Sequence, residues 1–399
     1  MPYTEELKQK IEAYIEENRQ AALEFLEALV NLEGKDGEEA QLRQTAAFLQ
    51  EQFANAGLET SLLEAGGGHA PVVTGVLNSD VPGRELIFTG HYDTVFPAGS
   101  WGPSPFRAES GKACGPGVCD MKGGITIAFF VVKALKELGF RGCPVRLIFV
   151  GDEEGDRSGG RTVEILREHA RNALVAFNME NGYESGEVCI GRKGVCEYKV
   201  TVTGVAAHPG HAYDAGRNAI EEMAHKVIGL QGCTPKNPDR EYSVSVGTIQ
   251  GGIGTNSVPA HCEARVDVRM TSRKALEECE EKMRAVCNRT VIDGTRTTLE
   301  QMDMLIPFET TDAVRSAYET LKTISDETTG TITGSIVVGG ASDASYFAEQ
   351  GAKIVCQCGI RGAFTHSRQE YAVIESIYDG IRLFTWTALN WQRFQQDGN

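Results

Sequence analysis

Residues of the types that bind metal ions stand just after several apolar segments of this 399-residue chain. They are His91 and Asp93 after LIFTG, Asp120 in the glycine-rich GPGVCDMKGG, Glu153 and Glu154 after RLIFVGD, Glu180 after LVAFNM and His366 after IVCQCGI. Imidazole nitrogens and carboxylate oxygens suit zinc or another divalent transition metal. Reactive groups of open α/β sheets gather beyond the carboxyl ends of the strands, so we expect these side chains to meet at one sheet edge. A bridging carboxylate would allow two ions.

Each of these residues, taken singly, also has an interpretation without a metal. Acids in turns are commonly solvated, which would account for Glu153, Glu154 and Glu180. The histidine and aspartate of GHYD would form a plain hydrogen bond, and Asp120 would cap the helix that begins near Gly123. The metal interpretation is favoured because several separate elements all end in a ligand type at the same predicted edge.

The elements that must position these residues alternate between helix and strand in most of the chain. Apolar periodicity predicts helices in 4–57, 123–138 and 374–391, and strands at 72–77, 85–89, 145–150, 174–178 and 353–360. This alternation is typical of an α/β sheet covered by helices. Cys356 and Cys358 lie in the last of these strands, so we expect both on one face, in the core.

The stretch from 193 to 305 follows a different pattern. Residues 195–202 and 261–270 alternate apolar with polar, as in a sheet with one face in water. Ile220, Met223, Ala224, Val227 and Ile228 form an apolar stripe at helical spacing. With strands at 242–248 and 297–304 and a helix at 272–287, the order is β-α-β-β-α-β. This order predicts a ferredoxin-like unit inserted into the α/β domain.

Composition excludes several classes of protein. The chain has 39 Lys+Arg against 55 Asp+Glu, a formal charge of −16, which argues against a general nucleic-acid binder. Its 11 cysteines are scattered, as expected for reduced and mostly buried thiols. The amino terminus does not resemble a signal peptide, and the longest apolar run, 125–132, is too short to span a membrane. We therefore expect a soluble cytoplasmic protein with no membrane partner. The sequence contains no GxSxG or P-loop motif, which argues against a serine hydrolase and against a P-loop nucleotide-binding protein.

Five segments of the chain resemble, in order, the five ligand-bearing motifs of the co-catalytic zinc exopeptidases. They are GHYDTVFP, GPGVCDMKGG, GDEEG, the later Glu180 and THS. That family includes glutamate carboxypeptidase, aminoacylase and succinyl-diaminopimelate desuccinylase. The resemblance covers nearly the whole chain. It implies an α/β, zinc exopeptidase-like catalytic domain, with a mixed sheet flanked by helices, in residues 1–192 and 306–399. The ferredoxin-like α+β insert, residues 193–305, would be a lid and dimerisation domain.

The resemblance also implies a metal centre. Asp120 would bridge two zinc ions, His91 and Glu180 would complete one site, and Glu154 and His366 would complete the other. Such ligands also accept cobalt or manganese. In the family the peptide bond after the bridging aspartate tends to be cis, which here is Asp120–Met121.

Catalytic roles follow from the same resemblance. Glu153 would be the general base that takes a proton from the attacking water and passes it to the leaving amine. Asp93 would orient His91, since metal-bound imidazoles usually donate their other N–H to such a partner. His208, in GVAAHPG, would reach across a homodimer interface to stabilise the oxyanion. In the alternative interpretation, His208 is simply a histidine in a turn before Pro209.

Further positions match substrate contacts of the family. Asn256 in GGIGTNSVPA and Arg269 would hold the carboxylate of the substrate, although Arg269 would otherwise be an exposed strand residue. Gly340, with Gly339, matches a loop whose backbone approaches the substrate. One departure is that residues 304–308 read MLIPF, where glutamate-releasing members are expected to carry a further arginine. This puts a strict preference for C-terminal glutamate in doubt.

The sequence thus predicts a zinc-dependent hydrolase that cleaves an amide bond in a small carboxylate-bearing substrate, such as a dipeptide, a C-terminal residue or an N-acyl amino acid. The alternative is a non-catalytic homologue that binds a metal or ligand on the same fold. Cys119, beside the bridging aspartate, would be a small apolar residue or, alternatively, a redox switch.

Overall fold

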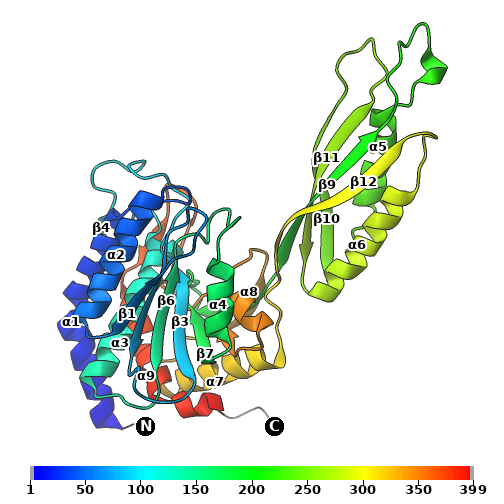
Figure 1. Cartoon of the computed structure of the whole chain (residues 1–399). Coiled ribbons are helices and arrows are strands. Elements are labelled where there is room, and N and C mark those ends of the chain that lie inside the picture. Colours follow the sequence, from blue (N-terminus) through cyan, green and yellow to red (C-terminus); the bar gives the residue numbers. More distant parts are fainter. Residues whose placement is uncertain (1–3, 396–399) are drawn as a thin grey trace. The chain divides into compact units, whose positions relative to one another are not determined.

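A computed structural model describes residues 4–395 of the chain. The predicted catalytic domain also includes residues 1–3 and 396–399, which lie outside the described residues. The chain forms two compact units (Figure 1). The first holds the residues up to Ile190, Thr310–Ile336 and the residues from Tyr346 onward, and the second holds Gly191–Glu309 and Val337–Ser345.

A six-stranded mixed sheet forms the centre of the first unit. Its strands, in spatial order, are β1 (Glu59–Leu63), β2 (Val72–Leu77), β6 (Val145–Val150), β3 (Glu85–His91), β7 (Ala173–Asn178) and β14 (Ile354–Val355). The last four run parallel to one another, whereas the first two pair antiparallel. Three adjacent parallel strands, β6, β3 and β7, therefore bring their carboxyl ends to the same edge.

Helices lie on both sides of this sheet in Figure 1. They are α1 (Glu5–Asn31), α2 (Glu39–Asn55), α3 (Gly123–Glu137), α4 (Thr162–Ala170), α7 (Asp312–Thr328) and α9 (Glu375–Leu389), whereas α8 (Ala344–Glu349) begins in the second unit. Helices α1, α3 and α9 contact one another, α2 contacts β1 and β2, and α7 contacts β14. The prediction of a mixed sheet flanked by helices is confirmed. No helix within residues 4–395 is both long and apolar enough to cross a membrane.

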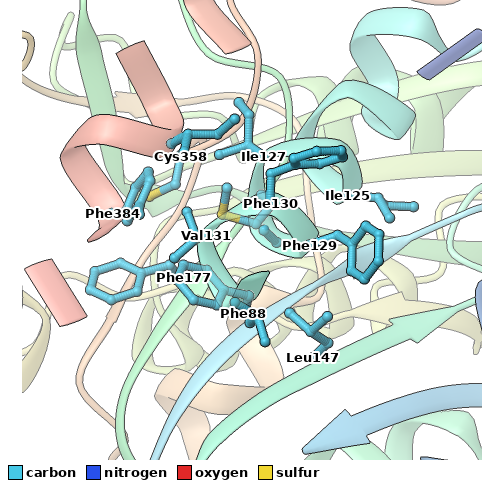
Figure 2. Packing of buried hydrophobic residues seen from close by; sticks show 14 of the residues in the cluster. Phe88, Ile125, Ile127, Phe129, Phe130, Val131, Leu147, Phe177, Cys358 and Phe384 are labelled. Carbon is cyan, nitrogen blue, oxygen red and sulfur yellow. The ribbon is translucent and has the colours of Figure 1, made fainter. Parts of the chain in front are cut away.

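The core of the first unit is rich in aromatic rings. Phe88 of β3 lies 5.8 Å from Phe177 of β7 and 5.7 Å from Phe384 of α9, measured between ring centroids. Figure 2 shows these rings together with Leu147 of β6 and Val131 of α3. All residues of β3 and β7 are buried, as expected for parallel strands covered on both faces. The strands that end at the predicted edge are thus fixed from both sides.

The predicted strand at 353–360 is much shorter in the structure. Only Ile354–Val355 is strand, and Gln357 adopts a left-handed backbone with φ 57°, which breaks the extended run. Cys356 and Cys358 are both buried, so their place in the core is confirmed. Their predicted common strand face is wrong, because the chain turns between them.

Short strands that the sequence analysis missed hold the loop that carries His366. They are β15 (Gly362–Ala363), β16 (Tyr371–Val373), β5 (Lys112–Cys114) and β4 (Arg107–Glu109), which form one antiparallel sheet in that order. Strands of two or three residues leave too little alternation in the sequence to be recognised. A further pair, β8 (Glu187–Arg192) and β13 (Gly334–Val338), makes a two-stranded sheet.

The second unit contains the ferredoxin-like order predicted for the insert. Its elements are β9 (Gly194–Thr203), α5 (Ala219–Gln231), β10 (Tyr242–Gly251), β11 (His261–Met270), α6 (Arg273–Asn288) and β12 (Arg296–Leu305). The antiparallel sheet has the strand order β10-β11-β9-β12. In β11 every second residue from Cys262 to Met270 is buried, as the alternation predicts. Asn218 caps α5 and Ser272 caps α6 through side-chain hydrogen bonds.

The buried face of α5 differs from the predicted stripe. Met223 is buried as expected, but Ile220 is 39% exposed and Ile228 is 73% exposed. The helix instead buries Glu222 and Lys226, whose charged groups lie 2.6 Å apart. A polar pair that neutralises itself can occupy a core position that a purely apolar pattern assigns elsewhere.

Candidate metal centre

The predicted ligands stand at the carboxyl ends of the parallel strands or in loops beside them. His91 ends β3, Glu153 and Glu154 follow β6, and Glu180 follows β7. Asp120 lies in a short turn, Val118–Lys122, directly before α3, and its own backbone is not helical, with φ −116° and ψ 89°. His366 lies between β15 and β16 and has a left-handed backbone with φ 61°. All of these residues belong to the first unit.

One half of the centre is built around His91, which is 1% exposed. Its Nε2 lies 3.2 Å from Oδ1 of Asp120 and 4.0 Å from Oε1 of Glu180. One ligand atom from each of these three residues lies within 4.8 Å of the other two. Burial opposes a charge on the imidazole, but hydrogen bonds to Asp120 and Asp93 outweigh it and raise the pKa of His91 well above its ordinary value.

The other half is built around His366, whose Nε2 lies 2.8 Å from Oε1 of Glu154 and 3.3 Å from Oδ2 of Asp120. These three residues also offer ligand atoms within 4.8 Å of one another. Hydrogen bonds to Asp120 and Glu154 raise the pKa of His366 to about 10. Asp120 therefore faces one histidine with each of its two carboxylate oxygens.

The helix-cap interpretation of Asp120 is wrong, because the N-cap position of α3 is Lys122 and makes no side-chain capping bond. Although burial favours the neutral carboxyl, bonds to His366 and His91 hold the pKa of Asp120 well below its usual range. The solvated-acid interpretation also fails for Glu180, which is 5% exposed, and for the partly buried Glu153 and Glu154.

Asp93 is fully buried and connects His91 to the acidic pair. Its Oδ1 lies 3.4 Å from Nδ1 of His91, and its two oxygens accept the backbone N–H groups of Glu153 at 3.2 Å and Glu154 at 2.9 Å. Burial raises its pKa, but the contact with His91 prevails and the pKa of Asp93 is lowered. Ligand atoms of Glu153, Glu154 and His91 lie within 4.8 Å of one another.

The donor set fits divalent metal ions. Two groups, each with one imidazole and two carboxylates, share Asp120. Five carboxyl groups gather around two imidazoles, and such a cluster of acids is stabilised by bound cations. Nitrogen and oxygen donors of this kind are found in zinc sites.

Comparison with known proteins identifies the family. Residues 87–390 match the sequence profile of Peptidase family M20/M25/M40. The chain belongs to this family. It is 28% identical over 370 residues to carboxypeptidase G2 of Pseudomonas sp. (strain RS-16), covering 90% of this chain and 86% of that enzyme. It is 27% identical over 314 residues to succinyl-diaminopimelate desuccinylase of Gluconacetobacter diazotrophicus, covering 74% of this chain and 78% of the relative.

Solved structures share the fold. Aminopeptidase PepT from Bacillus cereus aligns with a TM-score of 0.77 at 20% identity, covering 95% of this chain and 99% of that chain. Human carnosine dipeptidase 1 aligns with a TM-score of 0.67 at 16% identity, covering 99% and 100% of the two chains. The recognised family, the fold class and the assignment as a hydrolase are confirmed. This M20 family member is a hydrolytic metallopeptidase or amidohydrolase.

Two buried titratable residues near Asp120 were missed by the sequence analysis. Glu370 is 1% exposed, and its carboxylate accepts backbone N–H groups of the turn that carries Asp120. Burial raises the pKa of Glu370 to about 7. Lys122 is fully buried, donates to the carbonyl of Leu32, and has a pKa lowered to about 8 by burial. Neither residue follows a strand, so the rule that located the ligands does not reach them.

The residues flanking Asp120 bear on two further expectations. The peptide bond between Asp120 and Met121 is cis, as the family resemblance implies. Cys119 is fully buried, and burial raises the pKa of its thiol well above the ordinary value. Because thiolate character and exposure are what make a cysteine sensitive to oxidation, the small apolar interpretation of Cys119 is favoured.

The remaining predicted site residues lie in the second unit, which we describe by itself. His208 is exposed, accepts the N–H of Gly210 at Nδ1, and stacks on His211 with ring centroids 4.5 Å apart. Asn256 and Gly340 are exposed. Arg269 stands on the wet face of β11, where its Nε lies 2.9 Å from Asp267. These residues are therefore not part of the cluster around Asp120 within the first unit.

Proposed function

We propose that this protein hydrolyses an amide bond in a small carboxylate-bearing substrate, using water activated by two zinc ions. The observation that carries the proposal is the position of Asp120. One of its oxygens faces His91 and the other faces His366, within two donor groups that share it. A carboxylate placed in this way is suited to bridge two ions.

His91, Asp120 and Glu180 would hold one ion, and Asp120, Glu154 and His366 would hold the other. When bound, the ions supply Lewis acidity and lower the pKa of water. Zinc is the proposed native metal, and cobalt or manganese would also fit these donors.

Glu153 would act as the general base and then as the general acid. Its carboxylate lies beside ligand atoms of His91 and Glu154, so it can reach a water at the centre. It would take one proton from this water and deliver it to the leaving amine. Asp93 accepts the N–H of Glu153, which fixes the backbone that carries this base.

His208 would stabilise the oxyanion. Because its Nδ1 accepts the N–H of Gly210, the neutral ring carries its proton on Nε2 and can donate from there. We propose that it serves the centre of a partner copy in a homodimer. Ile228 of α5 and Ile249 of the edge strand β10 are 73% and 51% exposed, and a second copy would cover exposed apolar side chains of this kind.

Substrate recognition is assigned to Arg269, Asn256 and the backbone at Gly340. The guanidinium would exchange its contact with Asp267 for the carboxylate of the substrate, which it can bind through two parallel hydrogen bonds. The names of the relatives, a carboxypeptidase and a desuccinylase, fit dipeptides, C-terminal residues and N-acyl amino acids as candidate substrates. The apolar 304–308 segment argues against strict selection of glutamate.

The test is turnover of a mixed library of dipeptides and N-acyl amino acids, read by mass spectrometry with zinc supplied. We expect release of free amino acids, loss of activity with a chelator, and recovery with zinc. If the protein bound two zinc ions and turned over no member of the library, it would instead be a non-catalytic homologue. If it bound no zinc, the proposed metal centre would be wrong.

A further inference from the structure

A buried carboxyl group holds the turn that presents Asp120. Oε2 of Glu370 accepts the N–H of Gly117 at 3.3 Å, and Oε1 accepts the N–H groups of Cys119 at 2.9 Å and Asp120 at 3.0 Å. Gly117 has a left-handed backbone with φ 69°, which turns the chain just before Val118–Lys122. Three backbone donors thus converge on one side chain that is 1% exposed.

Glu370 is itself fixed by the loop that carries His366. Its N–H donates to the carbonyl of Ser367, and the hydroxyl of Ser367 donates to the carbonyl of Phe364 at 2.7 Å. The next residue, Tyr371, opens β16 and pairs with Cys114 of β5. The Glu370 side chain therefore ties the His366 loop to the Asp120 turn, two segments that are otherwise about 250 residues apart in the chain.

We propose that Glu370 is a positioning residue that sets the separation of Asp120 and His366, and thereby the affinity of the metal site that these two residues form with Glu154. The inference rests on the proposed two-metal function. Nε2 of His366 and Oδ2 of Asp120 lie 3.3 Å apart. Zinc holds such donors at about 2.0–2.2 Å, so small displacements of either segment weaken binding.

The chemistry of the side chain explains why a carboxyl group occupies this position. It offers an acceptor on each of two oxygens, and here both are used by backbone donors. Glutamine would keep one oxygen but turn an NH₂ group toward the remaining backbone N–H, so one donor would lose its partner. Alanine would leave all three donors without this acceptor. We therefore expect Glu370→Gln to be the milder and Glu370→Ala the more severe change.

The second unit supplies a matched control. Glu222 is also fully buried, and its Oε2 accepts backbone N–H groups of Val291 at 3.0 Å and Ile292 at 2.6 Å. It thus makes the same kind of contact within a different unit from the predicted metal ligands. A loss of stability alone would be shared by Glu222→Gln and Glu370→Gln, whereas a loss of metal affinity would be specific to Glu370.

The experiment compares metal binding by the chelator-treated wild type, Glu370→Gln, Glu370→Ala and Glu222→Gln. Zinc is titrated calorimetrically, and cobalt is titrated with its visible absorption recorded. We expect the Glu370 variants to bind one of the two ions, the one that Glu154 and His366 would hold, about 10–100-fold less tightly and to change the cobalt spectrum of that site. Glu222→Gln should keep both affinities and the spectrum.

Hydrogen exchange gives a second measurement on the same proteins. In Glu370→Gln the amides of residues 117–120 should exchange faster than in the wild type. Wild-type zinc affinities and an unchanged cobalt spectrum in a folded Glu370→Gln protein would overturn the inference while leaving the proposed function intact. A wild-type protein that binds fewer than two ions would overturn the two-ion function, and the inference with it.

Discussion

Both units pair acids with basic residues, as Glu85 does with Arg146 in the first, but among the described residues only the first unit also gathers acids around histidines. In the second unit, acids pair with lysine or arginine, as Glu197 does with Arg265 at 3.2 Å and the buried Glu222 does with Lys226 at 2.6 Å. In the first unit, both carboxylate oxygens of Asp120 face histidines, within a cluster of further acids. An acid paired with a fixed cation is already neutralised, whereas a cluster of acids around imidazoles gains most from mobile cations. Charge pairs of the first kind stabilise the fold, whereas the cluster around Asp120 would suit a metal ion.

The largest expected effect is a loss of catalytic rate on substitution of Glu153 in the first unit. Glu153→Gln should lower kcat by about 10²–10⁴-fold, because the amide cannot take a proton from water. Zinc stoichiometry should stay unchanged, since Glu153 belongs to neither of the two proposed ligand sets. Steady-state kinetics and metal analysis measure both quantities. Glu164→Gln, an exposed acid on α4, is the control and should keep the parental rate. Equal rates in Glu153→Gln and the parent would refute the role of Glu153.

Removing Lys226 tests whether its buried ion pair with Glu222 stabilises the second unit. Lys226→Met should lower the free energy of unfolding of the second unit by about 3–5 kcal/mol, because it leaves Glu222 buried without its cation. Denaturant unfolding followed by hydrogen exchange would locate the loss. Lys199→Met, which removes a more exposed pair with Glu300, is the matched control and should cost little. Comparable losses in the two variants would contradict a special role for the buried pair.

Zinc should stabilise the two units unequally. At a free concentration about 100-fold above its dissociation constant, a ligand that binds only the folded state adds about 2.7 kcal/mol of stability. We expect hydrogen exchange to slow around His91, Asp120 and His366 on addition of zinc, and to stay unchanged in α5 and β11. Protection that rose equally in both units, or in neither, would argue against a metal centre confined to the first unit.

Acid should weaken the second unit through Glu222. Burial opposes the charge of this carboxylate, but Lys226 and the N–H groups of Ile292 and Val291 prevail and hold its pKa below the ordinary value of 4.5. The folded state therefore binds this proton less readily than the unfolded state, and the stability from Glu222 is lost as the pH falls through the lowered pKa. One such group contributes a slope of at most about 1.4 kcal/mol per pH unit.

Urea unfolding between about pH 5 and pH 3 measures this slope. Wild type should lose stability more steeply than Glu222→Gln over this range, and the two proteins should approach each other at the acid end. Parallel pH profiles would show that Glu222 makes no such contribution.

The smallest effect on stability is expected at the solvent-exposed face of the sheet in the second unit. Arg265 lies 3.2 Å from Glu197 and 3.4 Å from Glu263, but all three side chains are exposed by about a third or more. Arg265→Ala should change the free energy of unfolding by about 0–1 kcal/mol, because water already screens these charges. Thermal unfolding at low and high salt would measure the change. A decrease in the free energy of unfolding as large as that expected for Lys226→Met would show that surface charges stabilise this unit as much as the buried pair does.

Much of the fold follows from local sequence patterns. The strands at 72–77 and 145–150 have the predicted limits, because a mostly apolar run bounded by turn residues leaves little choice. The alternation in 261–270 likewise predicts the buried face of β11. The pattern is less informative for α5, where Glu222 and Lys226 take core positions as a pair and leave Ile228 exposed. The pair itself is local, because its residues stand four apart on one helix, but its burial is a tertiary property that a hydrophobicity pattern does not record.

For the candidate site, the sequence by itself determined which chemical groups are available and that they follow parallel strands. His91, Glu154 and Glu180 could be proposed as neighbours because the carboxyl ends of such strands meet at one edge. The family resemblance already placed Asp120 between His91 and His366, whereas only the tertiary structure gave the distances to these histidines and decided that Glu370 holds the Asp120 turn. The physical reason is the distance along the chain over which each interaction acts. Strand geometry depends on a few neighbouring residues, whereas the hydrogen bond between Glu370 and Asp120 joins two segments that meet only when the whole unit packs.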